Sequence, residues 1–426
     1  MPTYLIVFAI GGIAVSLLTF LIAFFHPGLG YRTEAERTPP VNSPEFLRMV
    51  RLLADSQSHA DARVKVLTNG GTFYEAELAA IRKARSHISL EAYIFHKGEI
   101  ATRFIEALTE RARAGVEVRI VLDAVGSLNT WPRTFADLTK AGGKIAWYNA
   151  FRWYNLPRLN NRTHRELLIV DGRTGFIGGA GIADHWWKRR GRRRPQWRDT
   201  MFRVEGSAVS SLQSMFAENW LEASGELLVD PKYYPQYEEV AGIPALVINS
   251  TPSFGRSSRA RMLFQLLLTS AGRSIHVTTP YFLPDRSAIR ELVRAMVDRG
   301  VEVKILVPGR HNDHLLTRRS SRRLYGDLLK HGAQIFEYRP SMIHTKALVV
   351  DGVWSVVGST NFDHRSFGIN DEVNLAVLDE AFAERMEEDF NHDLIRSHRV
   401  TYEEWLNRSP LERFNEWIGW ILERQE

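Results

Sequence analysis

The sequence predicts an α/β protein of two duplicated halves, with mixed sheets flanked by helices, preceded by one N-terminal transmembrane helix. Three observations support this: alternating strand-like and helix-like segments, an internal repeat, and a long uncharged stretch near the N-terminus. The 426 residues are 44% hydrophobic and 24% charged, which suits a large folded core and excludes a mainly disordered chain. Cysteine is absent, which excludes disulfides, thiolate nucleophiles and cysteine-bound metals.

Residues 4–25 form an uncharged apolar stretch. As a helix rising about 1.5 Å per residue, this stretch could cross a hydrocarbon core of about 30 Å. The alternative is a cleaved signal peptide, which the length of the run and the lack of a basic region before it disfavour. We therefore expect a single-pass anchor, and the arginines from Arg32 onward favour a cytoplasmic body.

Residues 26–60 are expected to form a linker and a short helix that starts at Ser43 and Pro44. Beyond them, strand-like and helix-like segments alternate, as in α/β units around a buried sheet. The clearest of these segments are residues 88–95, 100–115 and 116–123. The C-terminal helix, at 401–426, has an apolar face that we expect to pack onto the body. That face comprises Leu411, Phe414, Trp417, Ile418 and Ile421.

An internal repeat divides the chain. Three ordered segments of the first half return in the second, and His164 and His344, in the third pair, lie 180 residues apart. The period is too long for a solenoid, so we expect a duplication of two α/β halves, at 61–235 and 236–400. The matched pairs are 84–95 with 272–284, 114–123 with 299–308, and 164–172 with 344–352.

The third pair carries the chemistry. On a strand, His344 and Lys346 point to the same face, and the chain turns back at Asp351 toward Ser359 and Asn361. An imidazole, an ammonium, a hydroxyl and an amide are groups that suit attack on a phosphodiester. With one histidine from each half, one could attack phosphorus while the other protonates the leaving alcohol.

The motif His-x-Lys-x4-Asp, followed by Gly-Ser-x-Asn, resembles the signature of the phospholipase D superfamily. Two copies behind an apolar segment resemble the bacterial cardiolipin synthases, and the likeness covers about residues 60–400. The resemblance implies two phospholipase D-like halves and a transfer through a phosphohistidine, without metal or cofactor. It also implies that two phosphatidylglycerols are joined into cardiolipin and glycerol, on the inner membrane of a bacterial cell. The implied partners are phospholipids and the membrane surface.

Carried over residue by residue, the second half matches the family motif completely. The resemblance implies that Glu372 orients His344, the expected nucleophile, and that Asp199 is its counterpart in the first half, where His164 acts as acid and base. The implied catalytic residues are His164, Asp171, His344, Lys346 and Asp351, and the implied substrate-binding residues are Ser359 and Asn361.

The first half departs from the motif. Glu166 replaces the lysine, and Gly179 and Gly181 replace the serine and the asparagine. A carboxylate beside a phosphate is repulsive unless it is protonated or neutralised. We prefer the interpretation that the first half supplies one histidine while the second binds the phosphate. Alternatively, an arginine compensates Glu166, or Glu166 binds an acceptor hydroxyl, or the site is degenerate and the enzyme weak.

Three other functions remain open. They are hydrolysis of phospholipids to phosphatidic acid, a phosphodiester nuclease, and a membrane-bound scaffold with a decayed site. The net charge of +6 favours anionic partners, but the apolar N-terminus and the tryptophans around the motifs argue against nucleic acid. His311 and His314 lack a third ligand at convincing spacing, so no metal is expected. The sequence does not determine the oligomeric state.

Overall fold

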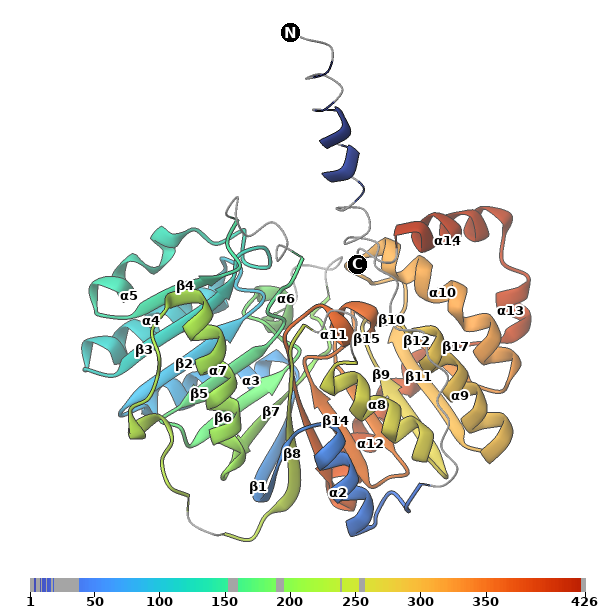
Figure 1. Cartoon of the computed structure of the whole chain (residues 1–426), viewed down its shortest axis with the longest axis horizontal. Coiled ribbons are helices and arrows are strands. Elements are labelled where there is room, and N and C mark those ends of the chain that lie inside the picture. The colour runs from blue at the N-terminus through green and yellow to red at the C-terminus, as the bar shows by residue number, and fades with distance from the viewer. Residues whose placement is uncertain are drawn as a thin grey trace.

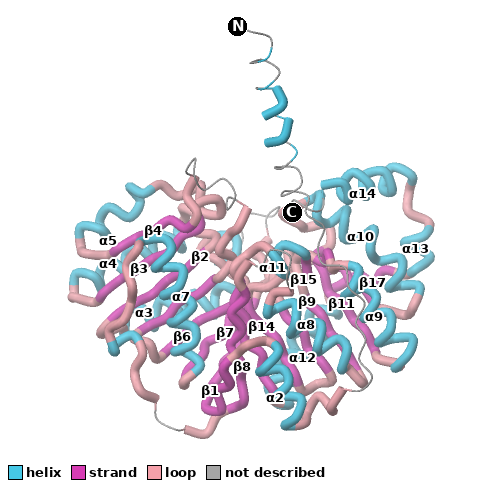
Figure 2. Tube along the Cα trace, viewed as in Figure 1, coloured by secondary structure: helices cyan, strands magenta, loops and turns pink. Residues whose placement is uncertain are grey.

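The computed structural model describes residues 38–151, 160–188, 195–237, 240–252 and 257–422, with scattered residues between Tyr4 and Leu18. Its centre is a 15-stranded mixed sheet (Figure 1). Strands occupy the middle and helices the outside of the body (Figure 2). This arrangement confirms the predicted α/β class.

Each half contributes seven strands in the same spatial order. The order is β4-β3-β2-β5-β6-β7-β1 in the first half and β12-β11-β9-β13-β14-β16-β8 in the second, with β17 added outside β12. The halves join where β1 pairs antiparallel with β8, so that Gln57 lies opposite Val247. The predicted duplication therefore appears as two like halves of one continuous sheet.

The first half contains β1 (Gln57–Thr68), α3 (Gly70–Lys83), β2 (His87–Ala92), α4 (Glu99–Arg113), β3 (Glu117–Asp123), η1 (Pro132–Phe135), α5 (Ala136–Lys140), β4 (Lys144–Tyr148), β5 (Glu166–Val170), β6 (Thr174–Gly178), α6 (Asp184–Trp187), β7 (Thr200–Glu205) and α7 (Ala208–Ser224), followed by η3 (Pro231–Tyr233). The strands and the helix predicted at 88–95, 116–123 and 100–115 are β2, β3 and α4.

The second half contains β8 (Ile243–Ser250), α8 (Arg259–Ser270), β9 (Ser274–Thr278), β10 (Phe282–Leu283), α9 (Arg286–Arg299), β11 (Glu302–Pro308), α10 (Leu315–Lys330), β12 (Gln334–Tyr338), β13 (Ala347–Val350), β14 (Trp354–Gly358), β15 (Phe362–Asp363), α11 (His364–Gly368), β16 (Glu372–Leu378), α12 (Glu380–Ile395) and β17 (Ser397–Val400). The chain continues into α13 (Tyr402–Leu406) and α14 (Pro410–Leu422). A separate two-stranded parallel sheet pairs β10 with β15.

The central strands are apolar on both faces because helices cover both. In β5, Leu168 and Val170 pack into a core with α3 and α4, whereas Leu167 and Ile169 pack into a core with α7. Side chains alternate across a strand, so the four-residue apolar run Leu167–Val170 serves two cores. Both faces of β5 are thus closed, and polar chemistry is confined to the strand ends.

The short helix predicted after the linker is α2 (Pro44–Leu53). Ser43 caps it, since its hydroxyl accepts a hydrogen bond from the Phe46 N–H at 3.1 Å. Phe46 and Val50 are buried in the core of the second half. The span predicted at 4–25 lies mostly outside the described residues. Among the residues that are described, no helix combines the length and the apolar character needed to cross a membrane.

The C-terminal helix α14 packs against α10, as predicted, but three of the five residues on its predicted apolar face point outward, and the side chains of Ile418 and Ile421 lie outside the described residues. Leu411, Phe414 and Trp417 are 69%, 55% and 50% exposed. Glu416 is buried instead and forms an ion pair with Arg408 at 2.8 Å. The helix lies beside α10 (Figure 1), with three large apolar side chains turned outward.

Candidate active site

The site lies between the halves, where β5 and β13 begin. A pocket of about 340 Å³ is lined from both halves, and it contains both motif histidines. His164 and Glu166 come from the first half, and His344, Asn361 and Arg365 from the second. The expected site at the interface of the halves is therefore present as a cavity.

The two histidines are paired with acids from the opposite halves. Nδ1 of His344 lies 2.9 Å from Oδ2 of Asp199. Nδ1 of His164 lies 3.1 Å from Oε2 of Glu372. This corrects the expectation that Glu372 serves His344 and Asp199 serves His164. Each half holds the imidazole of the other, and both acids are fully buried.

Backbone hydrogen bonds explain the crossing. The His164 N–H donates to the carbonyl of Asp371, the residue before Glu372, at 2.9 Å. The His344 N–H donates to the carbonyl of Arg198, the residue before Asp199, at 2.7 Å. Each histidine is thus attached by its backbone to the opposite half, next to the acid that its side chain meets.

His344 is the more enclosed histidine. It is 5% exposed, and its ring centroid lies 5.3 Å from that of Trp186 and 5.6 Å from that of Trp197. Burial, then the Lys346 charge, lowers the pKa of His344, against the opposing effect of Asp199. With a carboxylate on Nδ1, the nitrogen that can attack is Nε2, which lies 3.2 Å from Nζ of Lys346, and a neutral imidazole is the nucleophilic form.

Lys346 lies beside His344 and supplies the cation. Its Nζ donates to the His344 carbonyl at 2.9 Å and lies 3.1 Å from that imidazole's Nδ1. Burial lowers the pKa of Lys346 to about 8, against the opposing charges of Asp199 and Glu372. The ammonium is therefore close enough to act on a phosphate bound to His344.

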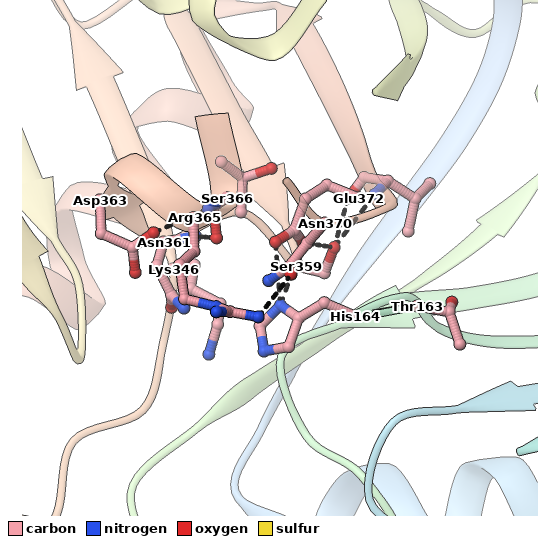
Figure 3. A network of polar contacts seen from close by, with 12 residues as sticks. Thr163, His164, Lys346, Ser359, Asn361, Asp363, Arg365, Ser366, Asn370 and Glu372 are labelled. Atoms are coloured by element: carbon pink, nitrogen blue, oxygen red, sulfur yellow. Dashed lines mark hydrogen bonds and ion pairs between the residues drawn. The ribbon is translucent and has the colours of Figure 1, made fainter. Parts of the chain in front are cut away.

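Ser359 and Asn361 have different positions, although both were predicted to bind substrate. Asn361 lines the pocket, and in the described part of the chain its side-chain oxygen has no hydrogen-bond partner. Ser359 is fully buried and donates to Oε2 of Glu372, the acid that holds His164 (Figure 3). Ser359 therefore supports the acid, which corrects its predicted contact with substrate.

Glu166 faces the pocket, and the two glycines beside it leave room for two long side chains. A Cβ on Gly181 would lie 2.8 Å from Oε1 of Glu166, and a Cβ on Gly179 would lie 2.8 Å from Nζ of Lys346. Burial raises the pKa of Glu166 well above its usual value, despite the Ile94 N–H and the Lys346 charge. A protonated Glu166 can donate a hydrogen bond, which removes the repulsion expected of a carboxylate.

Asp171 and Asp351, predicted as catalytic, lie at the other ends of β5 and β13. Seven residues separate Asp171 from His164, which is about 23 Å along an extended chain. Asp171 accepts hydrogen bonds from the N–H groups of Ser86 and His87 at 2.8 and 3.0 Å, with Arg85 beside them. Asp351 binds the N–H groups of residues 272–274 in the same way. Both aspartates therefore lie in turns away from the histidines, where they bind backbone N–H groups and stabilise the fold. This position corrects the prediction that they are catalytic.

A buried polar cluster behind His164 was not predicted. Asp371 accepts a hydrogen bond from Tyr148 at 2.7 Å, and Glu91 accepts one from Asn219 at 2.6 Å. Thr163 also donates to Glu91. Burial raises the pKa of Glu91 to about 7 and that of Asp371 to about 6. The sequence did contain one signal for this cluster: Thr163 directly precedes His164, and Asp371 directly precedes Glu372.

Arg165 does not enter the site. Its guanidinium points to the opposite face of β5 and donates to the Met215 carbonyl at 2.8 Å and to Asn249 at 2.7 Å. Arg165 is therefore not placed to replace the missing lysine. Across the described residues, no group of three or more His, Cys, Asp or Glu side chains is arranged to hold a metal ion.

Two α/β halves that share a histidine-based pocket for phosphodiester chemistry define an enzyme of the phospholipase D superfamily. Residues 78–220 and 265–394 match a family model described as cardiolipin synthase, PLD-like domain. The chain is 34% identical over 369 residues to the major cardiolipin synthase ClsA of Bacillus subtilis, covering 85% of this chain and 75% of that protein. It is 34% identical over 368 residues to a cardiolipin synthase of Listeria innocua, with the same two coverages, 85% and 75%. The chain belongs to the cardiolipin synthase family of phospholipase D-like proteins.

Solved structures show the same fold. The phosphatidylserine synthase of Haemophilus influenzae superposes with a TM-score of 0.65 at 13% identity, covering 89% of this chain and 96% of that one. Polyphosphate kinase of Porphyromonas gingivalis gives a TM-score of 0.53 at 12% identity, covering 88% of this chain and 53% of that one. At such identities the likeness concerns the fold alone.

Proposed function

We propose that this protein is a membrane-anchored phosphatidyltransferase that joins two phosphatidylglycerols into cardiolipin and glycerol. The observation that carries the proposal is the crossed pairing of His344 with Asp199 and of His164 with Glu372, at one pocket that also adjoins Lys346. The names of the relatives support the choice of lipid. The proposed halves are residues 61–235 and 236–400.

The chemistry proceeds in two displacements. Nε2 of His344 attacks the phosphorus of the first phosphatidylglycerol, and His164, in its protonated form, gives its proton to the leaving glycerol oxygen. The neutral His164 then takes the proton of a hydroxyl on the second phosphatidylglycerol. That oxygen attacks the phosphorus, the P–N bond to His344 breaks, and both histidines return to their starting states. Lys346 and Asn361 bind the nonbridging oxygens in both steps.

We propose that the pocket opens toward a bilayer surface. Val125 lines the pocket and is 48% exposed, and nearby in sequence Leu128 and Trp131 are 70% and 65% exposed. Phe151, which follows β4, is 77% exposed. Together with the exposed side chains of α14, these groups suit contact with lipid. The proposed location is the inner membrane of a bacterial cell, with residues 4–25 as the anchor and the body in the cytoplasm.

Lipid mass spectrometry tests the proposal. Purified protein is incubated with phosphatidylglycerol vesicles, beside His344→Ala and a matched surface control, His331→Ala, which alters an exposed histidine. Cardiolipin and glycerol from the wild type and the control, and neither from His344→Ala, is the expected result. Phosphatidic acid as the sole product would assign hydrolysis instead. Cleavage of DNA, with phosphatidylglycerol left intact, would assign a nuclease.

A further inference from the structure

Arg365 brings a positive charge to the pocket in addition to that of Lys346. It belongs to α11 and lines the cavity together with His164 and Asn361 (Figure 3). Nη1 donates to Oδ1 of Asn160 at 2.8 Å, and Nη2 donates to the Asn160 carbonyl at 3.0 Å. Both acceptors are neutral. Within the described part of the chain, no carboxylate lies at ion-pair distance from this guanidinium.

The other charges at the pocket have partners of their own. Arg162 lies 3.3 Å from Oδ1 of Asp123. Asp313 accepts a hydrogen bond from the Tyr281 hydroxyl at 2.7 Å, and Asp363 accepts one from the Ser366 N–H at 2.8 Å. Burial lowers the pKa of Arg365, against the opposing effects of Tyr93 and Asp363, and the Arg162 charge acts in the same direction as burial. A half-buried guanidinium that has no carboxylate at ion-pair distance among the described residues favours an anion.

Arg365 lies on the His164 side of the pocket. Tyr93, whose ring centroid is 5.2 Å from that of His164, is within electrostatic reach of Arg365. Asp363 is within electrostatic reach of both His164 and Arg365. Lys346, by contrast, lies against His344, where the phosphorus of the donor lipid is attacked. The two cations therefore serve different ends of the pocket.

The two halves carry different residues at the position of Arg365. Arg365 and His185 are 180 residues apart, the same offset that relates His344 to His164. The second half thus carries a guanidinium where the first half carries an imidazole. A symmetric role, such as holding the common fold, would not require this difference.

We propose that Arg365 binds the phosphodiester of the acceptor lipid. This inference rests on the proposed function, in which His164 takes the proton of an acceptor alcohol. In phosphatidylglycerol that alcohol is joined through one glycerol to a second anionic phosphate, which needs its own cation. A guanidinium can hold two phosphate oxygens at once, so Arg365 selects an acceptor that bears a phosphate over a neutral alcohol.

A partition experiment tests this. Vesicles of phosphatidylglycerol are supplied with labelled glycerol, so that two acceptors compete for the same phosphatidyl-enzyme. Attack by phosphatidylglycerol gives cardiolipin, and attack by glycerol gives labelled phosphatidylglycerol. The ratio of these products does not depend on how fast the intermediate forms. It therefore reports the choice of acceptor alone.

Arg365→Gln is expected to lower the ratio of cardiolipin to labelled phosphatidylglycerol by about 10- to 100-fold, the range for loss of a charge-assisted contact. Arg365→Lys, which keeps the charge but not the planar fork, should fall between this variant and the wild type. Arg113→Gln removes an exposed charge from the last turn of α4, at the opposite edge of the sheet, and should leave the ratio unchanged.

Labelled phosphatidylglycerol formed by Arg365→Gln shows that the variant is folded and forms the intermediate. Equal losses of both products, with the ratio unchanged in Arg365→Gln and Arg365→Lys, would overturn the inference and leave the proposed function standing. A wild type that forms neither product would overturn the proposed function itself, and the inference with it.

Discussion

Asp199 of the first half accepts a hydrogen bond from His344 of the second half at 2.9 Å, although 145 residues separate them in sequence. Glu372 and His164 make the reciprocal contact across 208 residues. Neither half supplies both members of either of these two pairs by itself. The site therefore exists only when the two halves are joined. The crossed pairing also determines which acid serves which histidine.

The crossed pairing predicts which acid is needed for the intermediate. Asp199→Asn should reduce phosphoenzyme formation at His344 by about 10²- to 10⁴-fold, because the imidazole loses the carboxylate that fixes its tautomer and stabilises its cation. Glu372→Gln should reduce proton transfer by His164 in both steps, so that a phosphoenzyme still forms on His344, but more slowly, and also resolves slowly. Rapid quenching with labelled lipid and mapping of the labelled histidine distinguish the two variants. Label on His164 would contradict the assignment of the nucleophile.

The environment of Glu166 predicts that it acts as a neutral acid. Glu166→Gln keeps a neutral group of the same shape, and at pH 7 it should retain activity within about threefold. Glu166→Lys, although it restores the motif residue, places a second ammonium next to Lys346 and should lower activity at least about tenfold. Initial rates of cardiolipin formation decide between these outcomes. A fast lysine variant with an inactive glutamine variant would show that Glu166 works as a charged group.

The pKa of Lys346, about 8, predicts an alkaline limit to activity. The ammonium should be lost as pH rises through this value, and the rate should fall with it. Stability should change in the opposite direction. Because the folded pKa lies below the free value of 10.5, the unfolded chain binds more protons between the two values, and this contribution to stability rises over that range.

A pH–rate profile, with denaturant unfolding at the same pH values, measures both effects. Lys346→Arg, whose guanidinium stays protonated, is the control and should lose the alkaline limb even if it is slower. An unchanged limb in this variant would assign the titration to another group.

The turn aspartates predict a change in stability. Asp171→Ala removes the acceptor for three backbone N–H groups and should lower the free energy of unfolding by about 3 kcal/mol. Asp171→Asn keeps one acceptor oxygen and a side chain that tolerates the positive φ of 54°, so its loss should be smaller. Both variants should keep the turnover number of the folded enzyme. Full inactivation without loss of stability would restore the catalytic role that the motif suggested.

The sequence by itself determined the α/β class, the duplication, and the common direction of His344 and Lys346, although both lie just before β13 and not on the predicted strand. These properties are local or periodic. Apolar runs mark buried strands, the two-residue period of an extended chain places residues i and i+2 on the same side, and a repeated motif marks a repeated half. The departures at Glu166, Gly179 and Gly181 were also visible in the sequence, but not their arrangement around Lys346.

Only the tertiary structure decided which side chains meet. Antiparallel pairing of β1 with β8 places the halves edge to edge, and the backbone contacts of His164 and His344 then cross between them. This geometry assigns Glu372 to His164, buries Ser359 beneath that acid, and leaves Arg365 in the pocket without a carboxylate partner among the described residues. Order along the chain cannot reveal such contacts, because they depend on distances between segments that folding alone brings together.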